Sequence, residues 1–390
     1  MGTYDEKKRE LGIYIHVPFC VRKCNYCDFL SAPAGSEMQE KYVKELILEI
    51  RQFPEEEKKK YIVRSVFLGG GTPSVLIAKW IKEILDAVYE EFEMDPDAEI
   101  TIECNPGTLM RQKLHFYKEA GINRLSLGLQ SAKDSELMEL GRIHTFAQFV
   151  ETFEGARAEG FENINVDLMS SLPGQTLSSW RQTLRMVLAM KPEHISAYSL
   201  IVEPGTPFYE KYGEADELRA QGKEQSLLPS EETDRAMYEE TKNILQAAGM
   251  ERYEISNYSL PGRESVHNSG YWQRREYLGF GLGASSQTGH ERWKNTEIME
   301  EYLSGDHGRR EEEVLSEKDE MAETMFLGLR MMRGVSLENF RKRFGKDLLS
   351  VYEAQVDKLI REGLLQMSGG YLALTEHGID ISNAVFAEFI

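Results

Sequence analysis

The stretch GIYIHVPFCVRKCNYC, residues 12–27, joins an apolar run to three closely spaced cysteines. Cys20, Cys24 and Cys27 have the spacing C-x3-C-x2-C, and the chain contains only four cysteines. The β-branched and aromatic residues of 12–17 predict a strand, so the cysteines lie on the loop that follows it. Three thiolates can ligate three irons of a [4Fe-4S] cluster and leave the fourth iron for an exchangeable ligand. We therefore expect a cluster site here.

Two other uses of the cysteines have to be weighed. Disulfides are disfavoured, because the N-terminal residues 1–11 lack the apolar core of a secretory signal and a cytoplasmic, reducing location is expected. A zinc site with His16 as fourth ligand remains an alternative. Structural zinc sites usually take two separated pairs of ligands rather than one compact triplet.

Composition sets limits on the function. A chain of 390 residues with 41% hydrophobic and 28% charged residues is typical of globular proteins of two or three domains. No apolar run approaches the roughly 20 residues that a membrane span needs. The net charge of −19 argues against nucleic acid as a partner, because phosphate binding needs a concentrated positive surface.

Short apolar runs alternate with amphipathic stretches over the first half of the chain. Strands are predicted near residues 12–17, 62–68, 98–104, 122–128, 162–168 and 194–200. Helices are predicted near 37–52, 74–92, 108–120, 145–159, 177–190 and 231–249. Six strand-then-helix units predict an α/β fold: a partial, six-unit barrel of parallel strands, similar to an incomplete TIM barrel.

Polar and glycine-rich clusters follow the predicted strands, where ligands bind in such folds. The clusters are Gly69–Pro73, Glu103–Pro106, Gln130 and Asp167, with Arg142 just before a predicted helix. The glycines permit close backbone approach to a ligand, although a tight turn explains them equally well. Alternation along the strand directs Cys104 away from Glu103, so we expect Cys104 to be a packed structural thiol.

The remaining chain has a different pattern. We divide it into residues 1–205 for the barrel core, 206–312 for an extension and 313–390 for a C-terminal domain. The last part predicts helices near 318–332, 336–344 and 349–362 and a hairpin at 364–374, a winged-helix-like α+β order. The extension contains His267 in what reads as a loop, which by itself indicates a polar surface residue.

These motifs together resemble one known family. Tyr14–Cys20 (YIHVPFC) with Cys24 and Cys27 is similar to the entry signature of radical S-adenosylmethionine (SAM) proteins. Within them the chain resembles the branch of oxygen-independent coproporphyrinogen III oxidase (HemN) and the haem chaperone HemW, including a HemN-type C-terminal domain. The later motifs match in order: Gly69–Pro73, Glu103–Pro106, Gln130, Arg142, Asp167-Leu168 and Leu172-Pro173-Gly174.

The resemblance implies cofactors and the residues that hold them. The three cysteines would hold the [4Fe-4S] cluster, and SAM would chelate its open iron. In the oxidase some of the matching positions serve a second SAM, so the number of SAM molecules stays open here. The residues implied for SAM are Tyr14, Tyr26, Gly70, Gly71, Thr72, Glu103, Gln130, Arg142 and Asp167.

Two details of the resemblance favour the chaperone over the oxidase. The oxidase has a fourth cysteine two residues after the third, and Phe29 occupies that position here. The chaperone carries an H-N-x-x-Y-W motif, matched by His267–Trp272, whose histidine is implicated in haem binding. The resemblance thus implies a haem-carrying protein without catalytic residues. It would deliver haem to an acceptor apoprotein such as a membrane respiratory enzyme, acting in the cytoplasm or peripherally at the membrane. The alternative is a coproporphyrinogen III oxidase that uses a SAM-derived radical.

Overall fold

Six parallel strands form the centre of the molecule and lie side by side in chain order. The computed structural model describes residues 8–109, 111–223 and 225–390. All five neighbouring pairs are parallel, as the predicted six strand–helix units require. The strands are β1 (Arg9–Val17), β2 (Tyr61–Gly70), β3 (Met94–Cys104), β4 (Arg124–Gln130), β5 (Ile164–Ser170) and β6 (His194–Ser199).

The fourth strand begins two residues later than predicted. Asn123 uses its side chain to accept a hydrogen bond from the Ile100 N–H and to donate one to the Ala98 carbonyl, both at 2.8 Å. Asn123 therefore ties the chain to β3 before the regular ladder starts. A side chain that pairs with neighbouring backbone in this way competes with the strand pattern.

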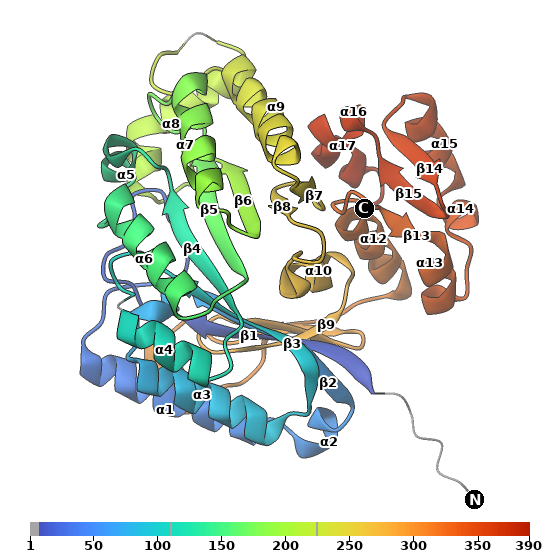
Figure 1. Ribbon diagram of the computed structural model, residues 1–390. Coiled ribbons are helices and arrows are strands. Elements are labelled where there is room, and N and C mark those ends of the chain that lie inside the picture. Colours follow the sequence, from blue (N-terminus) through green and yellow to red (C-terminus); the bar gives the residue numbers. More distant parts are fainter. Residues whose placement is uncertain (1–7, 110, 224) are drawn as a thin grey trace, which may run out of the picture.

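Helices cover the outer face of these strands (Figure 1). Their buried residues recur at helical spacing, as Ile81, Ile84, Leu85 and Val88 do in α3. The predicted helix at 74–92 is shorter, because Pro73 begins a separate 3₁₀ turn, Pro73–Val75. The helices are α1 (Ser36–Gln52), α2 (Glu55–Lys58), α3 (Ala78–Glu91), α4 (Arg111–Glu119), α5 (Asp134–Glu139), α6 (Phe146–Ala158), α7 (Leu177–Ala189), α8 (Pro207–Ala220) and α9 (Glu231–Ala247).

Residues between 250 and 314 add strands to both edges of the barrel sheet. The sheet has twelve strands in the order β12-β11-β10-β9-β1-β2-β3-β4-β5-β6-β8-β7. The additional strands are two to five residues long, which explains why no alternating pattern reveals them. They are β7 (Glu251–Arg252), β8 (Asn257–Ser259), β9 (Glu276–Phe280), β10 (Ser285–Thr288), β11 (Glu291–Lys294) and β12 (Arg310–Val314), with α11 (Met299–Leu303) between the last two.

His267 lies on a short helix, so its expected position in a loop is wrong. Helix α10 (Val266–Trp272) contacts β2, and Ser265 caps it by accepting a hydrogen bond from the Asn268 N–H at 3.2 Å. The Glu99 carboxylate of β3 accepts from the N–H groups of Val266 and His267, each at 3.1 Å. A negative charge at a helix N-terminus stabilises the helix, so the barrel itself holds α10 in place.

The C-terminal residues form a smaller unit with its own buried core beside the barrel (Figure 1). Its three strands have the order β13-β15-β14, and α12 contacts α10. The predicted helix at 349–362 is interrupted at Tyr352, whose ψ of 30° departs from helical geometry. The elements are α12 (Glu317–Gly328), β13 (Val335–Ser336), α13 (Leu337–Phe344), α14 (Leu348–Val351), α15 (Glu353–Arg361), β14 (Leu365–Ser368), β15 (Tyr371–Leu374), α16 (Glu376–Asp380) and α17 (Ser382–Ala387).

The lengths and composition of the helices show whether any of them could span a membrane. Within the part of the chain that the structure describes, none is both long and apolar enough to cross a bilayer. The domain limits expected at residues 205 and 312 stay a prediction.

Candidate functional site

A cavity of about 130 Å³ opens at the carboxyl ends of strands β1 to β5. This is the rim where barrels of parallel strands place their ligands. The cavity gathers every residue predicted for the cluster and SAM except Tyr14: Cys20, Cys24, Cys27, Tyr26, Gly70, Gly71, Thr72, Glu103, Gln130, Arg142 and Asp167.

The cysteine loop is held from both sides of the cavity. Asn25 donates from its backbone to the Leu140 carbonyl at 3.0 Å and from its side chain to the Glu139 carbonyl at 2.8 Å. On the other side, the Cys20 thiol lies 3.6 Å from the Thr72 hydroxyl. All three thiols are free, and burial raises the pKa of Cys27. A ligand that withdraws the thiol proton, as iron does, would offset this effect of burial.

Among the described residues, no three His, Cys, Asp or Glu side chains converge on the single ion position that the zinc alternative needs. Zinc would need its sulfurs about 2.3 Å from one ion, whereas an iron–sulfur cluster takes each thiolate on a different iron. His16 is also occupied: its Nε2 donates to the Leu30 carbonyl at 2.9 Å, and its Nδ1 accepts from the Tyr14 hydroxyl at 3.0 Å.

Arg142 brings a positive charge to the cysteine side of the cavity. One terminal nitrogen lies 3.5 Å from the Cys24 sulfur, and the other donates to the Gly128 carbonyl at 2.5 Å and to the Asn105 side chain. Its Nε is buried and has no acceptor among the described residues. A buried donor without a partner is costly, so this nitrogen is suited to meet a ligand carboxylate.

Two carboxylates face the same cavity, Glu103 from β3 and Asp167 from β5, on either side of β4. Burial, and then the negative charge of Asp167, raise the pKa of Glu103 to about 8. Burial also raises the pKa of Asp167, against hydrogen bonds donated by Asn165 at 2.8 Å and Ser126 at 3.0 Å. Two nearby carboxylates in a desolvated place favour a cationic ligand, because a positive charge relieves both effects.

The glycine run has a structural explanation of its own. A Cβ on Gly71 would lie 2.6 Å from the Phe19 carbonyl oxygen, and Gly70 has φ of +108° with a Cβ position 2.6 Å from the His16 ring. The close approach of β1 and β2 therefore requires both glycines. Gln130 is one of five non-glycine residues with positive φ among those described; its φ is +73°, and it lies at a register shift between β4 and β5. Such strain and irregularity are common beside functional sites.

Tyr14 does not line the cavity, and the Phe67 ring lies between its ring and that of His267. The Tyr14 ring centroid lies 6.4 Å from that of Phe67, and Phe67 stacks on His267 at 5.1 Å. Burial raises the pKa of Tyr14 well above its usual value. Tyr14 therefore connects the two regions for which ligands are predicted.

His267 is enclosed in the structure. Its side chain packs beside β1 and β2, and the residue is only 3% exposed. Both ring nitrogens are hydrogen-bonded, Nδ1 to the Ser65 hydroxyl at 3.0 Å and Nε2 to the Tyr271 hydroxyl at 3.1 Å. Burial and the charges of Arg275 and Arg124 lower the pKa of His267 to about 3. The imidazole is thus neutral, the form that ligates metals, but neither nitrogen is free.

Six further residues line the cavity: Arg22, Phe29, Cys104, Asn105, Ser126 and Gly128. Asn105 lies within the Glu103–Pro106 cluster and could have been singled out by its position after a strand. Ser126 and Gly128 carry no such signal, because they lie within β4 and resemble ordinary strand residues. Cys104 is buried as expected, although its edge also borders the cavity.

Two family models and several known proteins match this chain. Residues 14–187 match the family model of the Radical SAM superfamily, and residues 315–381 match that of the HemN C-terminal domain. A protein of Lactococcus lactis named heme chaperone HemW is 36% identical over 97% of this chain and 96% of its own length. Its namesake in Bacillus subtilis is 37% identical over 97% of this chain and 98% of its own.

A solved structure shows the same fold. Coproporphyrinogen III oxidase (HemN) from Escherichia coli superposes with a TM-score of 0.83, covering 98% of this chain and 90% of that one at 22% identity. That comparison supports the barrel with its C-terminal unit. At this identity it supports the fold alone.

Proposed function

The chain belongs to the radical SAM superfamily and, within it, to the HemW family, and from this premise we propose that it binds haem and passes it to an acceptor apoprotein. The observation that carries the proposal is the end-to-end similarity to proteins named heme chaperones, at 36% and 37% identity. In this proposal a [4Fe-4S] cluster and SAM occupy the cavity at the strand ends, and His267 ligates the haem iron.

The residues of the cavity fit the cluster and SAM. Cys20, Cys24 and Cys27 would hold three irons, and the cluster would supply an open iron to which SAM binds. SAM carries an ammonium group and a sulfonium centre, for which Glu103 and Asp167 provide negative charge. The carboxylate of SAM would accept a hydrogen bond from the unpartnered Nε of Arg142.

Haem ligation by His267 requires a movement of α10 or of the imidazole ring. Because both nitrogens of His267 are hydrogen-bonded, iron can reach Nε2 only after the Tyr271 hydroxyl has moved away. The proposal therefore requires an open form in which α10 or the imidazole has rotated. A site that must open binds with lower apparent affinity, because only the open fraction is competent. For a carrier, a lower apparent affinity favours release of the cargo.

Coproporphyrinogen III oxidation is the second candidate, because the residues of the SAM site are retained. The observation against it is Phe29, which borders the cavity with 61% of its surface exposed. The family pattern puts the oxidase's fourth cysteine at this position. An exposed phenyl ring offers no thiol there.

The acceptor and the cellular location belong to the proposal as well. We place the transfer in the cytoplasm, with the protein peripheral to the membrane when the acceptor is a respiratory haem enzyme. Val21 and Phe29 are the exposed apolar residues of the described cysteine loop, at 54% and 61%. In this proposal they are available to contact the acceptor.

The proposal is tested on protein whose cluster has been reconstituted anaerobically. Haem binding is followed by the Soret band, and conversion of coproporphyrinogen is measured in parallel, for the wild type and for His267→Ala and His267→Gln. His115→Ala, at an exposed histidine on α4, is the control. We expect the His267 variants to lose most haem binding, the control to retain it, and none to convert coproporphyrinogen.

Either of two outcomes would overturn the proposal. Robust conversion by the wild type would assign the oxidase activity instead. Undiminished haem binding in folded His267→Gln would remove His267 as the ligand. The melting temperature of each variant identifies a loss of binding that comes from unfolding.

A further inference from the structure

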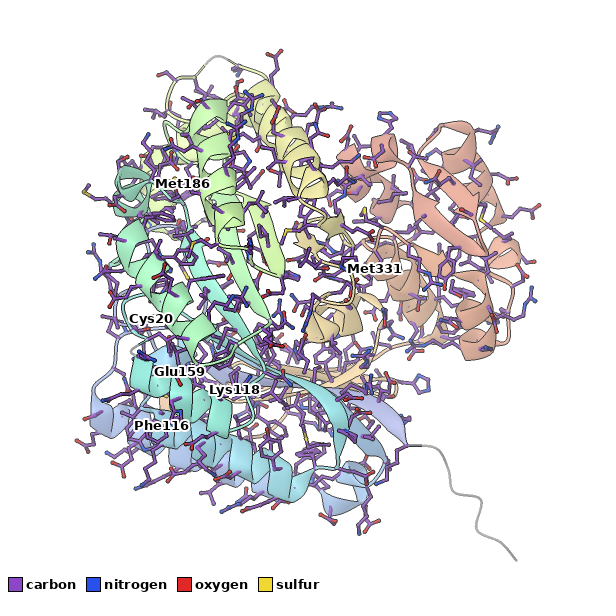
Figure 2. All side chains as sticks on the ribbon, viewed as in Figure 1. Cys20, Phe116, Lys118, Glu159, Met186 and Met331 are labelled. Carbon is purple, nitrogen blue, oxygen red and sulfur yellow. The ribbon has the colours of Figure 1, made fainter. Side chains whose placement is uncertain are left out.

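A second cavity, of about 250 Å³, lies between the end of α10 and the C-terminal unit. Its apolar lining includes Trp272 of the H-N-x-x-Y-W motif, Met331 and Phe340. Met331 is labelled in Figure 2 at the junction of barrel and C-terminal unit, well separated from Cys20 on the cluster loop. We call this second cavity the junction groove. It belongs to neither the cluster nor the SAM site.

Two arginines line the junction groove without an acidic partner. Arg333 stacks its guanidinium 4.2 Å from the Tyr371 ring centroid, and Arg343 donates only to the Arg274 carbonyl, at 3.3 Å. Among the described residues neither has a carboxylate within ion-pair distance, although the chain has 65 acidic residues. The nearby Glu323 carboxylate is taken up by Arg274 and Arg292. Glu320 and Glu276 also lie close enough for their charges to act on Arg343, but neither forms an ion pair with it. A guanidinium without an ion pair keeps donors with which it can bind an anion.

Trp272, which also lines the junction groove, carries an unused hydrogen-bond donor. Its indole Nε1 is buried and has no acceptor among the described residues. The guanidinium of Arg330 lies 4.3 Å from the Trp272 ring centroid and fixes the indole by a cation–π contact. Trp272 also lines a neighbouring cavity of about 340 Å³, together with Tyr271. The motif thus has two faces: His267 packs against the barrel, and Trp272 faces the junction groove.

We propose that the junction groove binds the carboxylate-bearing edge of haem, with Arg333 and Arg343 pairing with its two propionates and the indole N–H of Trp272 as a further donor. This inference rests on the proposed function and names the surface that the cargo meets. A cavity of about 250 Å³ is smaller than the roughly 300–1,000 Å³ of pockets that enclose a whole small molecule. It therefore takes one edge of the macrocycle, and the ring extends along Trp272 toward α10.

The chemistry of the groove matches this ligand better than other anions. A free phosphate would leave the indole, phenyl and thioether surfaces without a partner. Haem combines a flat apolar ring with two carboxylates on one edge, which suits aromatic walls beside paired guanidinium groups. The position next to α10 also places the cargo against the helix that has to move before His267 is free.

The test compares haem with its dimethyl ester, in which both propionates are neutral, on the complete protein. Each ligand is titrated into the wild type and into the double variant Arg333→Gln/Arg343→Gln. Arg341→Gln is the matched control, because Arg341 lies on the same helix as Arg343 but is exposed and pairs with Asp347. We expect the double variant to bind haem at least tenfold more weakly and the ester with unchanged affinity. The wild type should prefer haem over the ester by a similar factor.

The outcomes separate this inference from the proposed function. Wild-type protein that binds neither ligand would refute haem carriage itself. Protein that binds haem and ester equally, or whose haem affinity is the same in the double variant, would overturn the groove assignment and leave haem carriage intact. If the double variant fails to fold, the comparison of the two ligands on the wild type still decides.

Discussion

The cavity at the strand ends and the surroundings of His267 are both built on β1 and β2. They differ in whether their polar groups are free to bind a ligand. The cavity is open: its three thiols are free, and the Nε of Arg142 has no acceptor among the described residues. The surroundings of His267 are closed, with both ring nitrogens hydrogen-bonded and the residue 3% exposed. One site is prepared for its ligand before the ligand arrives, and the other is not.

The difference suggests a division of labour. A prepared cavity suits a resident cofactor, because its polar groups already wait for a partner and little reorganisation is needed on binding. A closed site suits a cargo that has to be released. Its own hydrogen bonds replace the ligand when the ligand leaves, so the empty protein is stable. Five predicted effects would sharpen or break this contrast.

The largest effect is expected at the cysteine loop. Cys24→Ser should abolish the cluster, because a hydroxyl does not replace an iron-bound thiolate, while haem binding by the apoprotein persists. Iron and acid-labile sulfide analysis measures the first effect and the Soret titration the second. Cys104→Ser, at the buried fourth cysteine, is the control and should keep its cluster. Parallel loss of haem binding in Cys24→Ser would show that the two regions are not separate.

The next largest effect is expected on SAM affinity when the carboxylate of Glu103 is removed. Glu103→Gln should weaken SAM binding by about 30-fold, as expected for losing a charged hydrogen-bond partner in a desolvated site. Isothermal titration of SAM into the reconstituted protein measures this. Glu119→Gln, at an exposed glutamate on α4, is the control.

The same variant changes stability in a defined direction without SAM. The folded protein holds the Glu103 pKa near 8, against 4.5 ordinarily, so it keeps a proton that the unfolded chain releases. Glu103 therefore lowers the unfolding free energy progressively as pH rises from about 4.5 to 8. Glu103→Gln should be more stable than the wild type at pH 8 and similar at pH 4.5. Urea unfolding at the two pH values measures this, and equal stability at pH 8 would contradict it.

A smaller effect is expected on stability: lowering the pH should destabilise the protein through His267. Its pKa near 3 means that the unfolded chain takes up a proton below about pH 6.5 and the folded protein does not. The unfolding free energy should therefore fall by roughly 1 kcal/mol between neutral pH and pH 5.5 from this residue alone. His267→Gln should lack this component of the pH dependence. A variant with the same slope as the wild type would mean that the imidazole is not enclosed in solution.

The smallest effect is a gain of function. Tyr271→Phe removes the hydroxyl that occupies Nε2 of His267, so haem affinity should rise about fivefold, the worth of one ordinary hydrogen bond. Tyr277→Phe is the control, because the Tyr277 ring packs against that of Tyr271. Its haem affinity should stay that of the wild type. A decrease in Tyr271→Phe would show that the hydroxyl supports the bound haem rather than competing with it.

The two regions also differ in how far the sequence predicts them. The strand-end cavity follows from local information: the strand pattern and the rule that ligands sit at strand ends bring Cys20, Glu103 and Asp167 together. The enclosure of His267 does not follow, because it depends on Ser65, 202 positions away, and on Glu99, 168 positions away. Helix α10 has seven residues and contains Gly270, so its own propensity is weak.

The contact between Glu99 and α10 has a mechanical consequence. The helix is fixed at its first residues and is about 10 Å long, so it can act as a lever with its pivot near Val266. A rotation of about 20° at the pivot would carry the far end by roughly 3 Å and leave the near end almost in place. Tyr271 and Trp272 are at the far end, and His267 is beside the pivot. A small swing would thus withdraw the hydroxyl from Nε2 while the imidazole keeps its stack on Phe67.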